Sequence, residues 1–193
     1  MKQVLLVLSD HWNASTGVLY CLEEDLKLAP IPVSLGKNGM GWGRGEHSVQ
    51  EGPEKREGDL RSPAGIFRLG PFFGKEPEIL SFPYLLIDEE LECVDDPTSV
   101  HYNRFVRCSE TNSDWKSAEK MSLYQRGITI QHNYEAPQPG AGSCIFIHEW
   151  ASEQAPTAGC TAMARERLLE LFSWLDATKE PRLIQLPVDL LRN

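Results

Sequence analysis

The sequence predicts a β-rich α+β fold, in which a single domain spans residues 1–193. Three observations predict it. Short apolar or alternating segments recur between Gly, Pro and acidic turns, as is typical of strands. One segment near the C-terminus has a clear helical repeat of apolar residues. The chain contains no internal repeat, no low-complexity tract and no linker long enough to separate two domains. Many short strands with one or two helices indicate the α+β class.

The first half of the chain is predicted to be almost entirely strands and loops. Its expected strands are residues 2–9, 17–22, 30–35, 64–70 and 84–88. The first of these is an apolar run that ends at Ser9-Asp10, and an acidic turn separates the second from the third. Residues 36–46 are rich in Gly and have no periodicity, so we expect a loop there.

The second half supplies the helices. Residues 113–124 are expected to form a short helix with Ser113 as its N-cap. Residues 164–176 form the main helix, because one stripe of a 3.6-residue repeat collects the apolar side chains Ala164, Leu168, Leu171, Phe172 and Leu175. The strands expected in this half are residues 127–133, 143–149 and 182–187.

Charge and hydropathy exclude several classes of function. The formal net charge is −9, whereas a general nucleic-acid-binding protein needs a basic face. The longest apolar run, residues 4–8, is far shorter than the roughly 20 residues of a membrane span. That run also lacks a small-residue cleavage site, so we expect no signal peptide of the usual kind. The Gly-rich segment 36–46 has no phosphate-loop context, so we do not expect it to be a phosphate-binding loop.

The spacing of the cysteines excludes a zinc ribbon. The chain has five, an odd number, so at least one thiol is unpaired within the monomer. No two of them form a C-x-x-C pair, and one His with one Cys is a poor zinc site. A chain of this size does not need a disulfide framework for its stability.

The segment 142–163 combines the two residue types of a thiol nucleophile and its base. Within the strand 143–149, Cys144, Phe146 and His148 alternate onto one face. A loop of small residues follows, and Cys160 lies directly before the main helix, where we expect a depressed thiol pKa. A thiolate is both nucleophile and leaving group for acyl transfer, and an imidazole can accept and return the proton.

The residues beside Cys160 predict how the oxyanion is stabilised. Gly159 lets the backbone approach a substrate closely. The N–H groups of residues 159–161, including that of Thr161, are expected to form an oxyanion hole. The structural alternative is that Cys160 is an ordinary buried cysteine and His148 a core histidine whose hydrogen bonds are made within the protein, since Cys is among the most buried residue types.

Two motifs resemble those of the L,D-transpeptidase catalytic domain, the YkuD-like family. His148 followed by Thr157-Ala158-Gly159-Cys160 is similar to the family's His-loop-[Ser/Thr]-x-Gly-Cys pattern. The segment 62–67 (SPAGIF) is similar to its T/S-P-x-G-x-F strand. The resemblance implies a β-sandwich or mixed-sheet fold, with the main helix after the catalytic Cys. It also implies a Cys160 thioester, proton transfer by His148, peptidoglycan stem peptides as substrate, and neither cofactor nor metal.

The chain departs from the family pattern at two positions beside the thiol. Ala158 replaces the usual second His, and Ala162 replaces the usual Arg or Asn. The core Pro156–Ala162 (PTAGCTA) resembles a divergent branch associated with 1–3 links between L-Ala and diaminopimelate. The resemblance leaves two alternatives open: a peptidoglycan hydrolase that uses the same Cys–His site, and a non-catalytic cell-wall binding module.

Several other residues are weaker candidates for substrate binding, each with a structural alternative. They are Thr157, His132, Asn133, Tyr102, Arg104, Arg61 and Trp42. His132 and Asn133 either line the cleft or form a turn. Arg104 and Arg61 either bind a stem-peptide carboxylate or are solvated. Trp42 either stacks on a sugar or peptide, or packs on the core.

The substrate class implies a location in the periplasm or at the cell wall. The absence of a visible signal peptide leaves a cytoplasmic location open. The sequence contains no pattern that predicts an oligomeric state.

Overall fold

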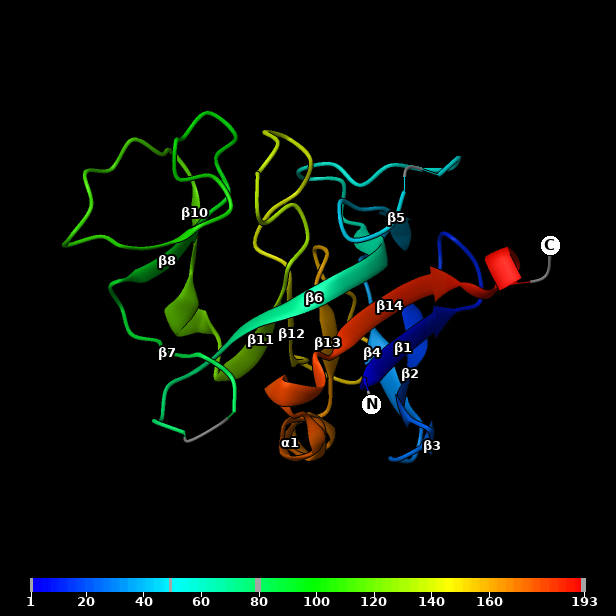
Figure 1. Ribbon diagram of the computed structural model, residues 1–193. Helices are drawn as coiled ribbons and strands as arrows, with labels where there is room; N and C mark the ends of the chain where they lie inside the picture. The colour runs from blue at the N-terminus through cyan, green and yellow to red at the C-terminus, as the bar shows by residue number, and fades with distance from the viewer. Residues whose placement is uncertain (1, 49, 79–80, 192–193) are drawn as a thin grey trace.

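A long mixed sheet and a small three-stranded sheet make up the computed structural model, which describes residues 2–48, 50–78 and 81–191 (Figure 1). The strands of the large sheet and its side branches are β1 (Val4–Ser9), β2 (Thr16–Glu23), β3 (Asp25–Leu26), β4 (Ile31–Ser34), β5 (Met40–Trp42), β6 (Ser62–Gly74), β7 (Tyr84–Leu86), β11 (Arg126–Ile130), β12 (Phe146–Glu149), β13 (Thr161–Met163) and β14 (Arg182–Pro187). The small sheet contains β8 (Leu91–Val94), β9 (Phe105–Arg107) and β10 (Ala118–Lys120). The helical segments are α1 (Arg165–Trp174) and the 3-10 turns η1 (Met121–Leu123), η2 (Ala177–Lys179) and η3 (Val188–Leu191).

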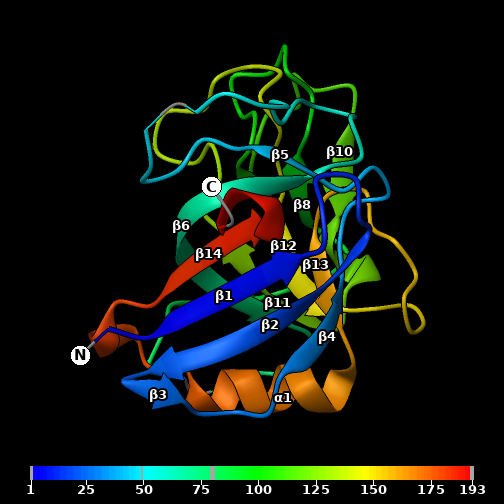
Figure 2. The ribbon, with the colours of Figure 1, turned by 90° about the vertical axis from the view of Figure 1, so that its right-hand side faces the viewer.

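The path of the large sheet closes on itself. Its strand order is β1-β14-β6-β11-β12-β13-β4-β2-β3, and β1 also pairs antiparallel with β2. Two links in this ring, β1 with β14 and β12 with β13, are parallel. Figure 2 shows β1, β2 and β14 side by side, with α1 running below them. Closure leaves few free edges in the sheet, which limits unwanted pairing with other chains.

The sheet separates two hydrophobic clusters. The larger cluster holds the inward side chains of the N-terminal strands, the centre of β6, and the apolar stripe of α1. The smaller cluster lies between the large and small sheets, and it contains Phe73, Met121, Phe146, Cys144 and Cys160. Ile145 and Ile147, the two neighbours of Phe146 in the chain, belong to the larger cluster. The predicted alternation along 143–149 is therefore confirmed, and it aims Cys144 and Phe146 at the smaller cluster.

The main helix is confirmed, and its apolar stripe is buried. Leu168, Leu171 and Phe172 are buried within α1, and the rings of Phe172 and Phe72 are 4.4 Å apart. Burial of large apolar side chains on one face is the main stabilisation of such a helix.

The predicted helix at 113–124 is wrong. Residues 118–120 form the strand β10, which pairs antiparallel with β8, and residues 121–123 form the single turn η1. Ser113 lies outside any helix. Residues such as Ala118, Glu119 and Met121 favour a helix, so pairing with the distant strand β8 overrides the local propensity.

Other differences concern strands that are very short or set in polar sequence. The Gly-rich segment 36–46 is not all loop, because β5 lies within it and pairs parallel with the start of β6. The strands β8, β9 and β13 are not predicted by the sequence. The strand predicted at 143–149 begins only at Phe146, because Cys144 has a φ of 52°, a value uncommon outside Gly, Asn and Asp.

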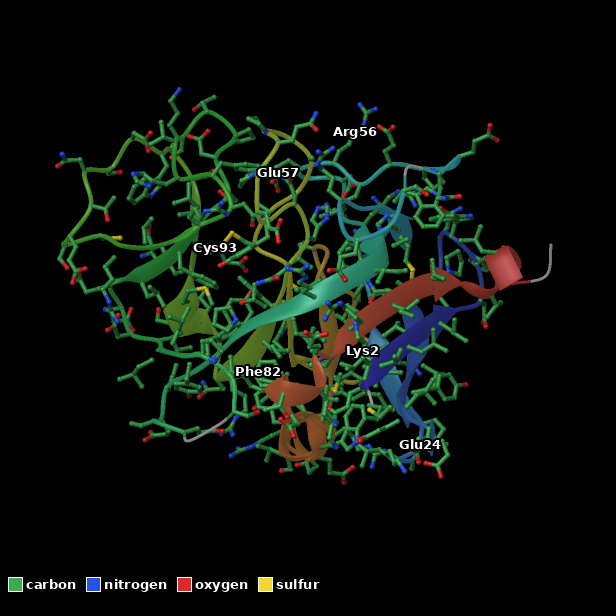
Figure 3. The ribbon with its side chains drawn as sticks, in the orientation of Figure 1. Lys2, Glu24, Arg56, Glu57, Phe82 and Cys93 are labelled. Carbon is green, nitrogen blue, oxygen red and sulfur yellow. A yellow bond between two sulfur atoms is a disulfide. The ribbon has the colours of Figure 1, made fainter. Side chains whose placement is uncertain are left out.

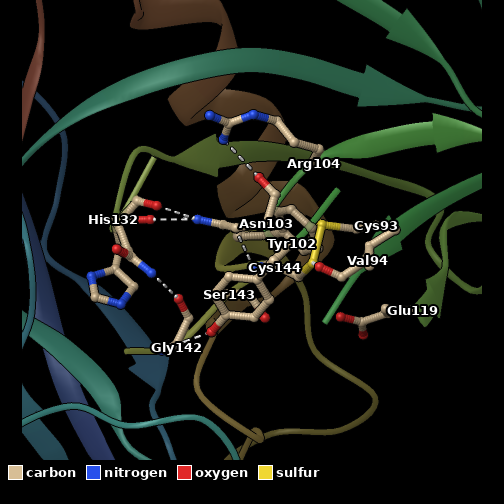
Figure 4. Close-up of a disulfide and its surroundings, with 12 residues drawn as sticks. Cys93, Val94, Tyr102, Asn103, Arg104, Glu119, His132, Gly142, Ser143 and Cys144 are labelled. Carbon is tan, nitrogen blue, oxygen red and sulfur yellow. Dashed lines mark hydrogen bonds between the residues drawn. A yellow bond between two sulfur atoms is a disulfide. The ribbon is translucent and has the colours of Figure 1, made fainter. Parts of the chain in front are cut away.

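A disulfide joins Cys93 to Cys144, across 51 positions of sequence. It connects β8 of the small sheet to the chain just before β12 of the large sheet (Figure 4). No pattern in the sequence predicts this bond. Cys21, Cys108 and Cys160 are free, which confirms that at least one thiol is unpaired.

Asn103 supports the same junction. Its amide nitrogen donates to the carbonyl oxygens of His132 and Asn133, and its amide oxygen accepts from the Cys144 N–H at 2.9 Å (Figure 4). In Figure 3, Cys93 and Glu57 are labelled above and to the left of Lys2 and Glu24. The small sheet is thus fixed to the large sheet by one covalent bond and one buried amide.

Candidate active site

Cys160 lies at the start of a strand, not at the start of the main helix. β13 occupies the three residues Thr161–Met163, and α1 begins only at Arg165. The expectation that Cys160 is the residue directly before the helix is therefore wrong. The expected depression of its pKa by the helix N-terminus is wrong as well, because the effect of a helix dipole fades within one turn.

The two sequence motifs meet at the backbone of Cys160. The Cys160 carbonyl oxygen accepts hydrogen bonds from Thr157 Oγ1 at 2.6 Å and from Ser62 Oγ at 3.1 Å. Ser62 begins β6, the strand of the S-P-x-G-x-F motif, and its hydroxyl oxygen also accepts from the Gly36 N–H. The physical role of Thr157 and Ser62 in these motifs is therefore to fix the backbone that carries the thiol.

Gly159 has a conformation that favours glycine. Its φ is +156°, and a Cβ atom there would lie 3.0 Å from the Arg61 carbonyl oxygen and 3.2 Å from Ile145 Cδ1. The Gly159 N–H donates to Thr157 Oγ1 at 3.1 Å. This N–H is therefore engaged inside the loop, and the oxyanion hole expected around residues 159–161 would have to use the neighbouring N–H groups.

Thr161 points its side chain away from Cys160. It is fully buried, and its hydroxyl donates to Gln185 Oε1 at 2.7 Å. The Gln185 amide nitrogen in turn donates to the Pro63 carbonyl oxygen. These contacts connect β13 to β14 and β6, so the side chain of Thr161 is structural and only its backbone is available to the site.

The Cys160 thiol is buried among backbone groups. Its sulfur accepts from the Phe146 N–H at 3.4 Å and lies 3.8 Å from the Cys144 carbonyl oxygen. Burial is the largest influence on the thiol and raises its pKa, and the Glu119 carboxylate raises the pKa further. The Phe146 N–H, Lys55 and the Tyr124 hydroxyl oppose this shift. Cys160 is thus held as a neutral thiol.

His148 presents one free ring nitrogen. Its Nδ1 lies 2.7 Å from the Glu149 carbonyl oxygen. A carbonyl can only accept, so Nδ1 carries a proton and Nε2 is the basic nitrogen of the neutral ring. Burial lowers the pKa of His148, which keeps the imidazole neutral and able to accept a proton.

Cys160 and His148 line one cavity of about 400 Å³, which we call the thiol cavity. Thr157, Gly159 and Ala162 also line it. His148 on β12 and Ala162 on β13 are register partners in a parallel strand pair. This pairing holds His148 next to the strand that begins directly after Cys160. The structure brings together the base and nucleophile that the sequence predicted.

Sequence reasoning missed several side chains of the thiol cavity, among them Tyr124 and Glu119. The Tyr124 hydroxyl donates to Glu119 Oε1 and also interacts with the Cys160 thiol. The Tyr124 ring packs edge-on against His148, with centroids 5.0 Å apart. Both residues lie in the segment that the sequence predicted as a helix, and no local pattern marks them.

His132 and Asn133 are structural and do not line the thiol cavity. His132 Nδ1 accepts from the Arg44 N–H, and Nε2 donates to the Ala141 carbonyl oxygen. Burial lowers the pKa of His132 to about 3. Asn133 is buried and hydrogen-bonds the backbone of Gln138 and Gly142.

Tyr102 and Arg104 also lie outside the lining of the thiol cavity. Tyr102 is buried, and its hydroxyl donates to Glu57 and accepts from the Gly142 N–H. The Arg104 guanidinium hydrogen-bonds two backbone carbonyls and lies over the ring of Tyr134. In the resting structure Arg104 is used to hold its own loop, not to face the thiol.

Arg61 and Trp42 do not line the thiol cavity either. The Arg61 guanidinium donates to the Met40 carbonyl oxygen at 2.7 Å and to Asn13 Oδ1 at 3.1 Å. Trp42 lines a second cavity, of about 520 Å³, together with Arg44 and His47. Lys55 borders both cavities, but Trp42 does not reach the thiol.

Within residues 2–48, 50–78 and 81–191, no group of three or more His, Cys, Asp or Glu is arranged to hold a metal ion. In the same residues, no helix is long and apolar enough to cross a membrane.

Comparison with known proteins gives one match. The family model of the L,D-transpeptidase catalytic domain, YkuD, matches residues 11–188. No curated protein and no solved structure matches the chain. The matched range includes both motifs, the disulfide and every residue of the thiol cavity named above.

Proposed function

The chain belongs to the YkuD family of L,D-transpeptidase catalytic domains, and from this premise we propose that Cys160 and His148 catalyse acyl transfer between peptidoglycan stem peptides. The observation that carries the proposal is the shared cavity, which holds a thiol and a neutral imidazole with a free basic nitrogen. We propose that the whole chain, residues 1–193, acts as one catalytic domain.

The first half-reaction forms a thioester. His148 Nε2 accepts the Cys160 proton as the sulfur attacks a stem-peptide carbonyl carbon. The Phe146 N–H, 3.4 Å from the sulfur, stabilises the developing negative charge. When the tetrahedral intermediate collapses, the C–N bond breaks and His148 returns the proton to the leaving amine.

The second half-reaction releases the enzyme. The amine of a second stem peptide attacks the thioester carbonyl, His148 removes a proton from it, and the sulfur leaves and is protonated again. We assign the oxyanion to backbone N–H groups of Cys160 and Thr161, because the Gly159 N–H is engaged by Thr157. With water in place of the amine, the same steps make a hydrolase.

The two alanines of the thiol cavity bear on the donor bond. Ala158 and Ala162 line the cavity where the usual family pattern has a His and an Arg or Asn. Small apolar side chains leave more room and fewer hydrogen-bond partners beside the scissile bond. We propose that this cavity accepts the donor of a 1–3 link, L-Ala to diaminopimelate.

Purified protein incubated with disaccharide-tetrapeptide muropeptides, followed by fragmentation mass spectrometry, tests the proposal. We expect dimers whose fragments place the link between positions 1 and 3. A 3–3 link would correct the donor assignment. Shortened monomers alone would show the hydrolase, and unchanged substrate with every muropeptide would favour the non-catalytic binding module.

The disulfide supports a location in an oxidising compartment. Disulfides persist in the periplasm and outside the cell, and they are rare in the cytosol. Cys93 and Cys144 are both buried and paired beside the site. We therefore propose that the protein acts in the periplasm or at the cell wall, where peptidoglycan is found.

The pH dependence of kcat/KM should reflect a neutral thiol and a neutral imidazole. Burial lowers the pKa of His148 from its ordinary value of 6.5, so the base stays unprotonated down to lower pH. We expect the acid limb of kcat/KM to have its midpoint below pH 6.5 and His148→Gln to abolish that limb together with most of the activity. The measurement is kcat/KM from pH 4.5 to 8, and a midpoint above 6.5 would contradict the assignment.

A further inference from the structure

A carboxylate lies beside the nucleophile and acts on it through a tyrosine. Glu119 is a partly buried residue of β10 on the wall of the thiol cavity. The Tyr124 hydroxyl donates to Glu119 Oε1 and lies within reach of the Cys160 thiol. Of the carboxylates that line the cavity, only Glu119 influences Cys160 appreciably.

The tertiary structure holds Glu119 in this place. Its β-register partner on β8 is Cys93, which is joined by the disulfide to Cys144. The Cys144 carbonyl oxygen is in turn 3.8 Å from the Cys160 sulfur. Figure 4 shows Glu119 beside the strand that carries Cys93 and Val94. The disulfide thus connects β8, the strand that pairs with the strand of Glu119, to the backbone next to Cys160.

The single proton that a tyrosine can donate determines whether the Cys160 thiol faces a hydrogen-bond donor or an acceptor. A phenol has one proton to donate. A phenol proton directed at the Cys160 sulfur lowers the pKa of the thiol. When the proton is directed at Glu119 instead, as in the Tyr124–Glu119 hydrogen bond, that contribution is lost and the phenol oxygen presents a lone pair to Cys160, which favours the protonated thiol. The negative charge of Glu119 acts in the same direction, since a like charge disfavours a thiolate.

We propose that Glu119 is a positioning residue that, through its charge and its hold on the Tyr124 proton, keeps Cys160 a neutral thiol in the resting enzyme. The inference rests on the proposed function, in which Cys160 is the nucleophile. Thiolates are the species that oxidants attack. A nucleophile that works in an oxidising compartment is thereby protected until substrate binds and His148 takes the proton.

Other charged groups face this pair. Asp95 and Glu57 raise the pKa of Glu119 after burial, the largest cause, while the Tyr124 hydrogen bond lowers it. Lys55 lowers the pKa of Cys160. Protonation of Glu119 at acidic pH should therefore make the thiol more acidic, and the wild-type protein itself should show this.

The experiment measures the rate of iodoacetamide alkylation at Cys160 from pH 5 to 10, resolved from the other cysteines by peptide mass spectrometry. In Glu119→Gln, we expect the midpoint to fall by at least one pH unit, so that Cys160 is labelled about tenfold faster at pH 7.5. Glu119→Asp, which keeps the charge, should label like the wild type. Sulfenic acid formed at Cys160 by hydrogen peroxide should rise in parallel in Glu119→Gln.

Asp95→Asn is the matched control, because it removes a carboxylate from the same cavity that has no contact with Tyr124 among those described. Its Cys160 profile should match the wild type. In a Tyr124→Phe background, Glu119→Gln should accelerate labelling less than it does alone. The labelling rate of buried Cys21, which rises when the chain unfolds, reports whether each variant remains folded.

Cys160 labelling that is unchanged or slower in Glu119→Gln would overturn the proposal, as would an equal acceleration in Asp95→Asn. An acceleration undiminished by Tyr124→Phe would overturn the role of the tyrosine. If Glu119→Gln does not fold, the pH profile of Cys160 alkylation in the wild-type protein tests the proposal. At pH values below the pKa of Glu119, the alkylation rate should exceed the rate extrapolated from neutral pH. A rate that follows the extrapolated line would refute the proposal. Alkylation needs no substrate, so muropeptide turnover that fails would count against the proposed function and not against this inference.

Discussion

Cys160→Ala should abolish muropeptide turnover while leaving the fold intact. Loss of the nucleophile of a covalent mechanism removes more than about 10³-fold in kcat. The side chain is buried, but the change removes one sulfur atom, so we expect the free energy of unfolding to fall by only about 1 kcal/mol. Product formation by mass spectrometry and the urea midpoint of the same sample measure both effects.

Cys108→Ala is the matched control for this prediction. It makes the same chemical change at an exposed free thiol outside the thiol cavity, and it should keep wild-type turnover and stability. Residual activity above a tenth of wild type in Cys160→Ala would rule out Cys160 as the nucleophile. A variant that unfolds would instead identify the residue as part of the core.

Removing the disulfide, by Cys93→Ala together with Cys144→Ala, should cause the largest loss of stability. Closing a loop of 51 residues restricts the unfolded chain by about 4 kcal/mol in the chain-entropy model. For a domain of this size, the loss corresponds to a fall of roughly 10 °C in Tm. Differential scanning calorimetry with and without dithiothreitol measures it, and the reductant should lower the Tm of the wild type only.

Turnover should fall in the same variant, because the bond holds the backbone that touches the nucleophile. The Cys144 carbonyl lies next to the Cys160 sulfur, and Cys93 is the register partner of Glu119. Cys21→Ala is the control, since it removes a buried thiol that is not paired and should cost only about 1 kcal/mol. Equal losses in the two variants would show that the disulfide contributes nothing beyond packing.

The divergent positions of the site have a physical consequence for substrate choice. With Ala158 and Ala162 in the cavity wall, the polar side chains that share the cavity with Cys160 include Tyr124, His148, Lys55 and the carboxylates Glu57, Asp95 and Glu119. Under the proposed function, we expect these groups, and not the two alanines, to provide the polar contacts with substrate.

The sequence could single out Cys160 and His148, the proposed nucleophile and base, because their signals are local. An apolar alternation ends at His148, and a small-residue loop leads to Cys160, all within twenty residues. The environment of the thiol could not be predicted in the same way. Helix proximity suggested a depressed pKa, but the three residues of β13 separate Cys160 from α1, and burial raises the pKa instead.

The weaker candidates show the same limit. His132, Asn133, Tyr102 and Arg104 are polar residues in loops, which sequence alone cannot distinguish from ligand-binding groups. In the structure, their side chains hydrogen-bond backbone or buried groups, which must be paired once they are removed from water. Their partners come from segments whose proximity depends on the fold.

The sequence by itself determined the elements whose stability is local: the alternating strand that aims His148, the amphipathic helix α1, the β-rich class, and the order of base and nucleophile. The tertiary structure alone decided the small sheet, the disulfide, the meeting of Ser62 with Cys160, and the placement of Tyr124 and Glu119. The physical reason is that very short strands such as β8 and β10 have little conformational preference of their own. They exist because distant segments supply their hydrogen-bond partners, and a local reading of the chain does not contain that pairing.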